Sequence, residues 1–576
     1  MSAAHHERPT ALSAQVAGVP RRHAELAVGT FCALVVVLFG LSALDRYNIT
    51  WDEALGDLFF GERYLFFFAT LDTTYLDFGA EAFEPPRDPD LGVSPFRGRP
   101  WEYYPVANTL AAASAELFGR QLGWVDVFDG FHLLNLALAA LLIVVMVRVV
   151  ARRWGLAAGA ASVGLLFGAP RIVAHMMANI KDFPLMVFFA LTAFAFVHAF
   201  ERGSVRGLLG AGVLLGLTLG TKANALFFPL LPALVLLFGG VPPAWRGRVR
   251  TLLAALVGAG AVSLVVLFAV WPYLWLDPLG HALEHIRYIA FRKDATRPES
   301  FAPALAMILW TTPPSLLVAW AVGLVPAIRA ARRGDRLALA ALVWPLAVMS
   351  RYALPQAVNF DGVRHFLEIF PALAVVGGLG VAWVCAGLVR ILRERLPKAR
   401  VQAVVATLVL APCAWAVLAT HPFQLCYWNG LVGGYGGARA AGLPQASDYW
   451  GASYRLGLEW LDEHAAPNAA LVVPVVEHAV RLVAPERLRG DLQLLPITTP
   501  FSPRIAPERL AKTLELARTR PLYVMMVDRR DWRNVLMEDV LARLEPEVEW
   551  RLDGAQVLAI YRYHPPPLPS PAVRQP

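Results

Sequence analysis

Long runs of apolar residues, separated by short polar loops, fill most of the first 420 residues of the chain. A membrane-spanning helix needs about 17–25 predominantly apolar residues, and windows of that kind recur along this region. We predict eleven spans, which cover roughly residues 27–44, 128–150, 155–173, 183–200, 206–220, 224–240, 251–273, 303–328, 337–354, 366–390 and 401–420. The stretch 106–124 is apolar but short and interrupted, so we place it at the membrane surface.

Arginines in the short loops predict the orientation of these spans. When the eleven spans are counted in order, six arginine-rich loops fall on one side, among them Arg21-Arg22, Arg152-Arg153 and Arg332-Arg333. Short loops that carry Lys and Arg stay in the cytoplasm. The N-terminus is therefore predicted to lie inside and the C-terminus outside.

Outside the spans, the chain divides into further parts. Residues 1–26 are predicted to form a cytoplasmic tail, and 45–127 a large first outer loop within a membrane domain that covers 27–420. Residues 421–564 are less apolar and indicate a separate extracytoplasmic domain. The last residues, 565–576, are rich in proline and are predicted to be disordered.

The outer domain 421–564 shows both helical and strand-like patterns. A helical spacing at 451–464 precedes strand-like runs at 470–476 and 521–527. Residues 547–563 indicate a hairpin that turns at Asp553-Gly554, because this dipeptide favours a tight two-residue turn. We therefore predict a small α/β domain.

Composition agrees with a polytopic membrane protein. The chain is 57% hydrophobic and 17% charged, with a mean hydropathy of +0.49, which excludes an ordinary soluble globular protein. Its net charge of +8 comes from arginines in the loops and does not indicate nucleic-acid binding. Cys32, Cys385 and Cys413 fall within predicted spans, so the four cysteines form no disulfide framework.

Two adjacent carboxylates, Asp52 and Glu53, follow the first span directly. Ionisable groups at a membrane boundary are costly, so they indicate a functional site. The alternative is that Thr50 or Asp52 caps the N-terminus of an amphipathic helix over 54–70, with the acids complementing its dipole. Capping accounts for one carboxylate more readily than for two.

A second polar group lies between the third and fourth predicted spans. Within eight residues it offers His175, Asn179, Lys181 and Asp182 at a membrane exit. The alternative is a turn in which Lys181 and Asp182 cap the next helix, with Pro184 in its first turn. We expect Asp182 to pair functionally with the acids of the first loop.

Cations on the predicted outer side form the third group. Lys222 follows the fifth span, Arg364-His365 begins the tenth, and Arg99 precedes the aromatic run that contains Tyr104. Cations on the outer side depart from the tendency of Lys and Arg to remain in cytoplasmic loops. They are well suited to binding a phosphate group. Their alternative role is pairing with lipid headgroups or with acids such as Asp361.

Together these motifs resemble the GT-C glycosyltransferases of family 39, which include protein O-mannosyltransferases and aminoarabinose transferases. The resemblance covers about residues 27–420. Its motifs are Asp52-Glu53, Lys181-Asp182-x-Pro184, Gly220-Thr-Lys222, Trp271-Pro-x-x-Trp-x-Asp-Pro278 and Arg364-His365-Phe366. Their order and membrane side fit the family, whereas the region after residue 420 departs from the aminoarabinose transferases and leaves the acceptor open.

The resemblance implies a GT-C-type all-α membrane domain of about eleven helices in a bacterial inner membrane. The enzyme would take a sugar from a polyprenyl-phosphate carrier and pass it to an unidentified envelope acceptor on the outer face. Asp52 would act as general base, supported by Glu53 and Asp182. Contacts to the lipid phosphate or sugar would come from Lys181, Lys222, Arg364, His365, Arg99 and Tyr104. No cofactor or metal site is assigned, although a divalent cation is left open.

Other functions would leave different patterns. A secondary transporter would show inverted repeats and charges at mid-membrane, but we find no repeat, and the acids lie at span ends. An oligosaccharyltransferase is disfavoured because Asp448-Tyr449-Trp450-Gly451 has the wrong order for its motif. A non-catalytic membrane scaffold with an outer domain would tolerate alanine at Asp52 and Glu53.

Overall fold

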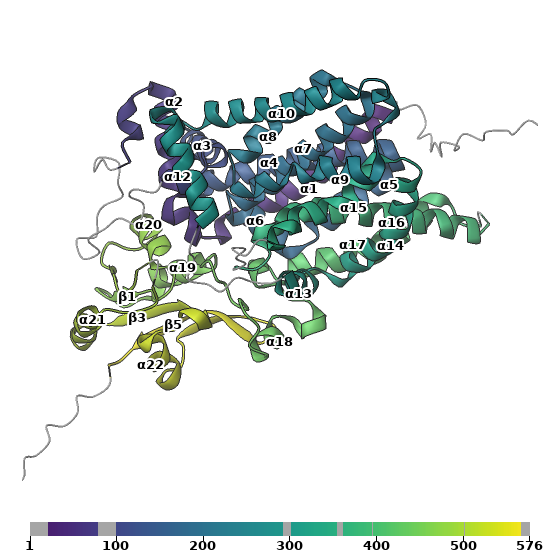
Figure 1. The fold of residues 1–576 in the computed structure, drawn as a ribbon. Helices are drawn as coiled ribbons and strands as arrows, with labels where there is room; N and C mark the ends of the chain where they lie inside the picture. The colour runs from purple at the N-terminus through teal and green to yellow at the C-terminus, as the bar shows by residue number, and fades with distance from the viewer. Residues whose placement is uncertain are drawn as a thin grey trace, which may run out of the picture.

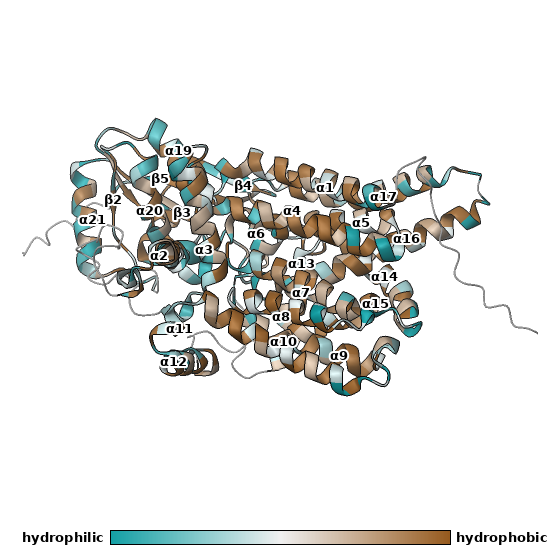
Figure 2. Ribbon diagram, turned by 90° about the horizontal axis from the view of Figure 1, so that it is seen from above, coloured by the Kyte–Doolittle hydropathy of each residue, from teal (hydrophilic) through white to brown (hydrophobic). Residues whose placement is uncertain are grey.

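The computed structural model describes residues 21–78, 100–291, 301–353, 361–393, 395–499 and 502–565. A long bundle of helices carries a small sheet domain at one end (Figure 1). Most residues of the bundle helices are hydrophobic (Figure 2). This arrangement confirms the predicted class, a helical membrane domain followed by a small α/β domain.

Seven helices in the described residues are long and apolar enough to cross a membrane. They are α1 (Arg21–Ala43), α4 (Val127–Trp154), α7 (Asp182–Arg202), α10 (Val249–Val270), α14 (Pro314–Arg332), α16 (Phe370–Ile391) and α17 (Lys398–Ala419). The shorter apolar helices α8 (Val205–Leu219), α9 (Leu230–Gly239) and α15 (Arg336–Met349) pack beside them. The total of about eleven spans stays a prediction.

Two predicted spans are broken at prolines. The span 155–173 consists of α5 (Leu156–Phe167) and α6 (Pro170–Ala178), which are bent by 69° relative to each other. The span 303–328 consists of α13 (Phe301–Thr311) and α14. Proline lacks the amide hydrogen that a continuous helix needs and disfavours helical geometry in the residue before it. Each of these two predicted spans therefore consists of two helices in the structure.

Glycines allow α14 and α16 to approach closely. At Gly323 of α14, an added Cβ would collide with the carbonyl oxygen of Val376 in α16. Gly378 of α16 leaves equally little space against Ser162 and Ala158 of α5. Small residues let helix backbones pack directly in a membrane, so these glycines hold the centre of the bundle together.

We expect Gly323→Ala to destabilise the protein by about 1–3 kcal/mol, because the new methyl group overpacks a backbone contact. The measurement is the thermal unfolding of the purified protein in detergent. Gly260→Ala in α10 is the matched control, since an added Cβ there meets nothing within 4 Å. An equal or smaller loss of thermal stability in Gly323→Ala than in Gly260→Ala would contradict the close approach.

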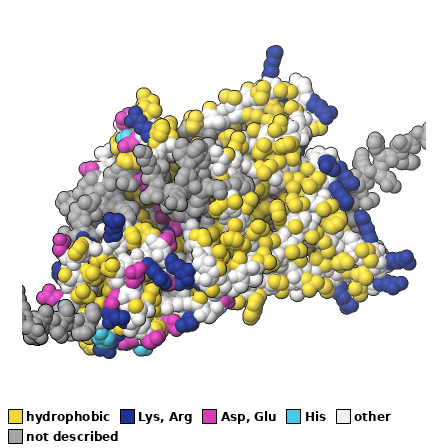
Figure 3. Space-filling model, turned by 60° about the horizontal axis from the view of Figure 1, so that its bottom comes forward, with side chains coloured by type: hydrophobic (Ala, Val, Ile, Leu, Met, Phe, Trp, Pro, Cys, Tyr) yellow, Lys and Arg dark blue, Asp and Glu magenta, His cyan; other side chains and the backbone are white. Residues whose placement is uncertain are grey.

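Basic side chains gather at the end of the bundle away from the sheet domain, beyond a broad apolar band (Figure 3). Arg152 pairs there with Glu25 at 2.9 Å, and Arg153 pairs with Asp335 at 2.8 Å and with Glu201. These arginines belong to the loops predicted to be cytoplasmic. The cytoplasmic assignment itself stays a prediction.

The first loop folds over the opposite end of the bundle. A π-helix at Glu53–Asp57 leads into α2 (Leu58–Thr70), and α3 (Pro105–Ser114) leads into a second π-helix before α4. The amphipathic helix predicted at 54–70 is thus present. Phe60 of α2 stacks on Tyr103 at 4.5 Å between ring centroids, which ties α2 to the start of α3.

The C-terminal domain contains a five-stranded sheet with the order β2-β1-β3-β5-β4. Its strands are β1 (Ala470–Val472), β2 (Gln493–Leu495), β3 (Leu522–Val527), β4 (Val548–Leu552) and β5 (Ala555–Tyr563). Strand β1 runs parallel to β2 and β3, whereas β5 runs antiparallel to β3 and β4. The domain's helices are α18 (Gly434–Ala440), α19 (Tyr454–His464), α20 (Glu477–Arg487), α21 (Pro507–Thr519) and α22 (Val535–Arg543).

Most elements expected in this domain are confirmed. The helix predicted at 451–464 is α19, and the two strand-like runs contain β1 and β3. The predicted hairpin turns at Asp553-Gly554, where both residues have a positive φ, as a tight two-residue turn requires. Strand β2 was not predicted, because a strand of three residues, of which one is buried, leaves little periodic signal.

Candidate active site

The first loop places its carboxylates through a capping arrangement. The Glu53 carboxylate accepts hydrogen bonds from the backbone N–H and the hydroxyl of Thr50, at 2.8 and 2.9 Å. This contact is half of a capping box, in which the residue three positions into a helix returns to the cap. It starts the helix at Trp51, so that Asp52 lies in the first turn.

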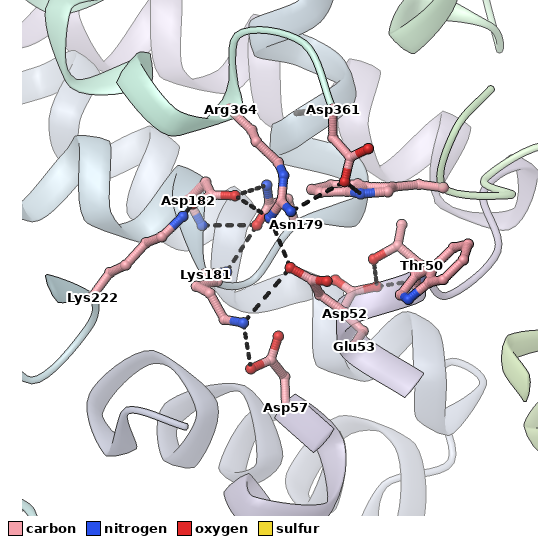
Figure 4. Close-up of polar contacts among 12 residues, drawn as sticks. Thr50, Asp52, Glu53, Asp57, Asn179, Lys181, Asp182, Lys222, Asp361 and Arg364 are labelled. Carbon is pink, nitrogen blue, oxygen red and sulfur yellow. Dashed lines mark hydrogen bonds and ion pairs between the residues drawn. The ribbon is translucent and has the colours of Figure 1, made fainter. Parts of the chain in front are cut away.

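The turn that follows is a π-helix, and this geometry determines which acids face the same way. Residues five apart are joined by the hydrogen bond of a π-helix and lie near one face. Asp52 and Asp57 are related in this manner, and both approach Lys181 (Figure 4). The Lys181 Nζ is 3.7 Å from Asp52 Oδ2 and 3.3 Å from Asp57 Oδ1.

Asn179 organises the turn between α6 and α7. Its side-chain oxygen accepts the backbone N–H groups of Lys181 and Asp182, at 3.0 and 2.8 Å. Its amide nitrogen donates to Asp182 Oδ2 at 3.0 Å and lies 2.9 Å from His175 Nδ1. The turn therefore carries Lys181 and Asp182 in fixed orientations at the start of α7.

Arg364, at the start of the turn Arg364–Ile369 before α16, reaches these acids from the side opposite Asp57 (Figure 4). Its Nη1 is 2.7 Å from Asp52 Oδ2 and 3.6 Å from Asp182 Oδ2, and its Nη2 is 3.1 Å from Asp361. Lys222, from the turn after α8, pairs with Asp182. Positions 52, 182, 222 and 364 are thus brought into one ionic cluster, together with 57, 181 and 361.

The carboxylates of this cluster differ in how deeply they are buried. The Asp52 side chain is 25% exposed, whereas those of Asp57 and Asp182 are 1% exposed and that of Asp361 is 7% exposed. Burial alone would raise the pKa of Asp52, but Arg364, Lys181 and Lys222 more than offset this and hold it below its usual range. Asp52 is therefore an ionised carboxylate that an outside group can reach.

Glu53 points away from the cluster. Besides Thr50, its carboxylate contacts His132 Nε2 at 3.2 Å and accepts the backbone N–H of Ile180 at 3.3 Å. Its side chain is only 1% exposed. These contacts connect the first loop to α4 and to the Asn179 turn, so Glu53 helps to hold Asp52 and Lys181 in register.

The other predicted residues occupy different places. His365 is buried next to Arg364, and its carbonyl oxygen accepts hydrogen bonds from Asn224 and Arg351 at 2.9 and 2.7 Å. The Tyr104 hydroxyl lies 3.1 Å from His285 Nε2 of α12 (Pro278–Phe291), within an aromatic cluster beside the ionic one. Arg99 lies outside the described residues.

The chain is similar in sequence and in fold to known proteins. Residues 99–273 match the family described as dolichyl-phosphate-mannose-protein mannosyltransferase. Among solved structures, ArnT from Cupriavidus metallidurans bound to undecaprenyl phosphate aligns over 93% of this chain and 97% of its own, with a TM-score of 0.52 and 15% identity. The chain therefore has the GT-C fold of ArnT, and part of its membrane domain matches the mannosyltransferase family model.

Two further findings complete the comparison. The oligosaccharyltransferase from Archaeoglobus fulgidus in the apo form aligns over 88% of this chain and 70% of its own, with a TM-score of 0.48 and 13% identity. A search of curated proteins finds no relative. The family segment contains Lys181, Asp182 and Lys222, and the expected GT-C fold is confirmed.

Sequence reasoning missed several residues that the fold places at the cluster. Asp57 lies within the predicted amphipathic helix 54–70 and was not selected. Asp361 was considered only as an acid that could pair with an outer cation. Arg529 comes from the C-terminal domain and lies 3.1 Å from Asp361 Oδ1. Trp450 donates its indole N–H to Asp361 Oδ2 at 3.1 Å, and the Arg364 guanidinium lies 5.1 Å from its ring centroid. The C-terminal domain thus contributes directly to the cluster.

No metal-binding group emerges from this arrangement. Within the described ranges, no three His, Cys, Asp or Glu side chains lie together as a cation site requires. The acids of the cluster are instead paired with Lys181, Lys222, Arg364 and Arg529. The site can therefore hold anionic groups against its cations while offering one accessible carboxylate.

We expect Asp57→Asn to change how stability depends on pH. Burial raises the pKa of Asp57 to about 6, although Lys181 opposes the shift. The folded state then binds the Asp57 proton more tightly than the unfolded state, so this group's contribution to stability falls as pH rises from about 4 to about 6, by on the order of 2–3 kcal/mol. Thermal unfolding across this pH range measures the effect; parallel curves for wild type and Asp57→Asn would contradict it.

Proposed function

We propose that this protein is a glycosyltransferase that moves a sugar from a polyprenyl-phosphate carrier to an acceptor on the extracytoplasmic face of a bacterial inner membrane, with Asp52 as general base. The observation that carries the proposal is the unequal burial of the cluster's acids. Asp52 alone among the four is 25% exposed, while Arg364 and Lys181 contact it and Lys222 pairs with the neighbouring Asp182. One reachable carboxylate and several fixed cations are what sugar transfer from a lipid phosphate requires.

The cations suit the donor. When the bond between sugar and carrier breaks, negative charge develops on the lipid phosphate, and preorganised cations stabilise that charge. Arg364 offers a planar fork and Lys181 and Lys222 offer point charges, all within the ionic cluster (Figure 4). The undecaprenyl phosphate bound to ArnT, whose fold this chain shares, supports a carrier of this class.

The carboxylate suits the acceptor. A hydroxyl group is a poor nucleophile at neutral pH, so a base within hydrogen-bond reach must remove its proton as it attacks the sugar. Arg364 and Lys181 hold Asp52 ionised. A phosphate that recruits those cations would weaken their hold on Asp52, raise its pKa and make it a stronger base.

The remaining residues have supporting roles in this proposal. Asp182 anchors Lys222 and Arg364, and Glu53 fixes the capped turn that presents Asp52. Tyr104 and His365 border the donor site, while Arg99 lies on the same outer loop. The partners are therefore a lipid-linked sugar, the membrane lipid and an acceptor of the cell envelope, with no role for nucleic acid.

The test is sugar transfer in membranes that contain the protein. Radiolabelled sugars on a polyprenyl-phosphate carrier are supplied to those membranes and to matched membranes without the protein. We expect labelled product to appear only with the protein, with inverted configuration at the anomeric carbon. Transport of a solute with no transfer from any lipid-phosphate sugar would instead favour a transporter.

A further inference from the structure

The helix α12 turns its apolar side outward. All of its residues are exposed or half-buried. Four exposed residues recur at helical spacing and form what we call the apolar stripe: Leu279, Leu283, Ile286 and Ala290. Residues three or four positions apart share one face of a helix. In a soluble domain such a face packs toward the core, so its exposure here indicates an apolar environment outside the protein.

The polar side of α12 packs against the rest of the protein. His285 Nε2 lies 3.1 Å from the Tyr104 hydroxyl, which belongs to the first loop. Glu284 accepts a hydrogen bond from the Tyr273 hydroxyl at 2.6 Å, and His281 stacks on the same tyrosine with 4.0 Å between ring centroids. These contacts fix the rotation of α12 about its own axis, because they hold its polar side inward. The apolar stripe therefore faces outward.

The direction of α12 differs from that of the membrane-spanning helices. The long apolar helices run along the bundle, whereas α12 runs across it and is seen end-on in the second view (Figure 1; Figure 2). It lies just past the end of α10 that is nearer the sheet domain (Figure 2). A helix that is perpendicular to the spans and lies at their ends is parallel to the membrane plane, at the edge of the hydrocarbon layer.

The exposed apolar surface of α10 continues onto α12. Only 11% of the most apolar stretch of α10 is buried inside the protein, and Val265 and Phe268 are exposed near its end. The short helix α11 (Tyr273–Leu276) follows, where Trp275 and Leu276 are also exposed. Trp275 donates its indole N–H to the carbonyl oxygen of Phe268 at 2.6 Å, which holds this ring at the end of the span. Tryptophan is enriched at this depth of a membrane.

We propose that α12 lies in the headgroup layer of the membrane, with the apolar stripe against the lipid acyl chains. Amphipathic helices bind membranes by burying one apolar face at the boundary between headgroups and acyl chains. Arg287 is exposed beside the stripe, and a long arginine side chain can reach lipid phosphates while its stem lies on apolar groups. The partner is therefore a phospholipid surface, and this contact is independent of the chemistry at Asp52.

The membrane contact has a consequence for the first loop. Because His285 holds the Tyr104 hydroxyl, α12 connects the lipid surface to the aromatic cluster beside the ionic one. The headgroup layer thus supports one wall of the candidate site from outside.

The test measures how deeply α12 lies in the membrane. A nitroxide label is attached to Ile286→Cys in the full-length protein with Cys32→Ala, since the other three cysteines are buried. The protein is placed in nanodiscs of phosphatidylethanolamine and phosphatidylglycerol. Power-saturation EPR then compares the access of oxygen, which partitions into lipid, with that of a water-soluble nickel chelate. Leu283→Cys repeats the measurement one turn away.

Two other exposed positions calibrate the ratio of oxygen to nickel access. Val257→Cys in α10 is the lipid-facing reference, with a side chain that is 74% exposed, and Val535→Cys in α22 is the water-facing one, 60% exposed. We expect Ile286→Cys and Leu283→Cys to give ratios several-fold above that of Val535→Cys and no higher than that of Val257→Cys. Ratios equal to that of Val535→Cys would place the stripe in water. Protection of both positions from both reagents would show that protein covers the stripe, and either result would overturn the proposal.

Discussion

Asp52→Asn should abolish sugar transfer while leaving the protein folded. The substitution keeps the shape of the side chain and removes the charge and basicity that the acceptor hydroxyl needs. Loss of general-base catalysis lowers turnover by about 10²–10⁴-fold. The measurement is the initial rate of transfer at saturating polyprenyl-phosphate sugar, with the amount of folded protein determined by size-exclusion chromatography.

Asp45→Asn provides the matched control for Asp52→Asn. Asp45 belongs to the same loop, but its side chain is 59% exposed and pairs with Arg46. We expect this variant to transfer sugar at the wild-type rate. Wild-type turnover in Asp52→Asn would remove Asp52 from the mechanism and leave the cations as a binding site alone.

The sequence selects candidate residues that the fold brings together, but it does not predict how they meet. Four residues were selected because charged groups are costly at membrane boundaries or uncommon on the outer side: Asp52, Asp182, Lys222 and Arg364. Each signal is local, so it survives in a single sequence. The contact between Arg364 and Asp52 spans 312 positions and depends on how the bundle folds, and no local pattern reports it.

The partner of Asp52 illustrates the same limit at short range. Adjacency in the sequence suggested Glu53, but neighbouring residues on a helix point in different directions. Because the turn is a π-helix, the acid that shares a face with Asp52 is Asp57, five positions later. Only the local hydrogen-bond pattern distinguishes a π-helix from an α-helix here, and the apolar pattern of 54–70 fits both.

The C-terminal domain shows what sequence reasoning could and could not reach. The turn at Asp553-Gly554 and the buried run of β3 have strong local signals and were predicted. No local sequence signal indicates the role of Arg529, since an arginine after a strand is most simply read as a solvated residue. In the folded protein it contacts Asp361 and lies over the ring of Trp51, at 5.3 Å from the centroid. The C-terminal domain therefore contributes side-chain contacts to the candidate site.

Arg364→Lys should lower transfer by about 10²–10³-fold, the typical effect of removing one donor that stabilises developing charge. Lysine keeps the positive charge, but its single ammonium cannot reproduce the fork that contacts Asp52, Asp182 and Asp361 together. We also expect a lower unfolding temperature, because removing one partner leaves buried carboxylates poorly compensated. Steady-state kinetics with varied lipid-phosphate sugar measure the first effect, and thermal unfolding measures the second.

Arg455→Lys separates these effects from the general consequence of shortening a buried arginine. Arg455 pairs with Asp129 at 2.6 Å, and its side chain is 12% exposed, but it contacts no member of the ionic cluster among the described residues. We expect this variant to lose some stability and to keep its turnover per folded molecule. If Arg364→Lys lost no more turnover than Arg455→Lys, Arg364 would serve only to neutralise buried acids. The charge on the leaving phosphate would then have to be stabilised by Lys181 and Lys222, which approach the cluster from the other side.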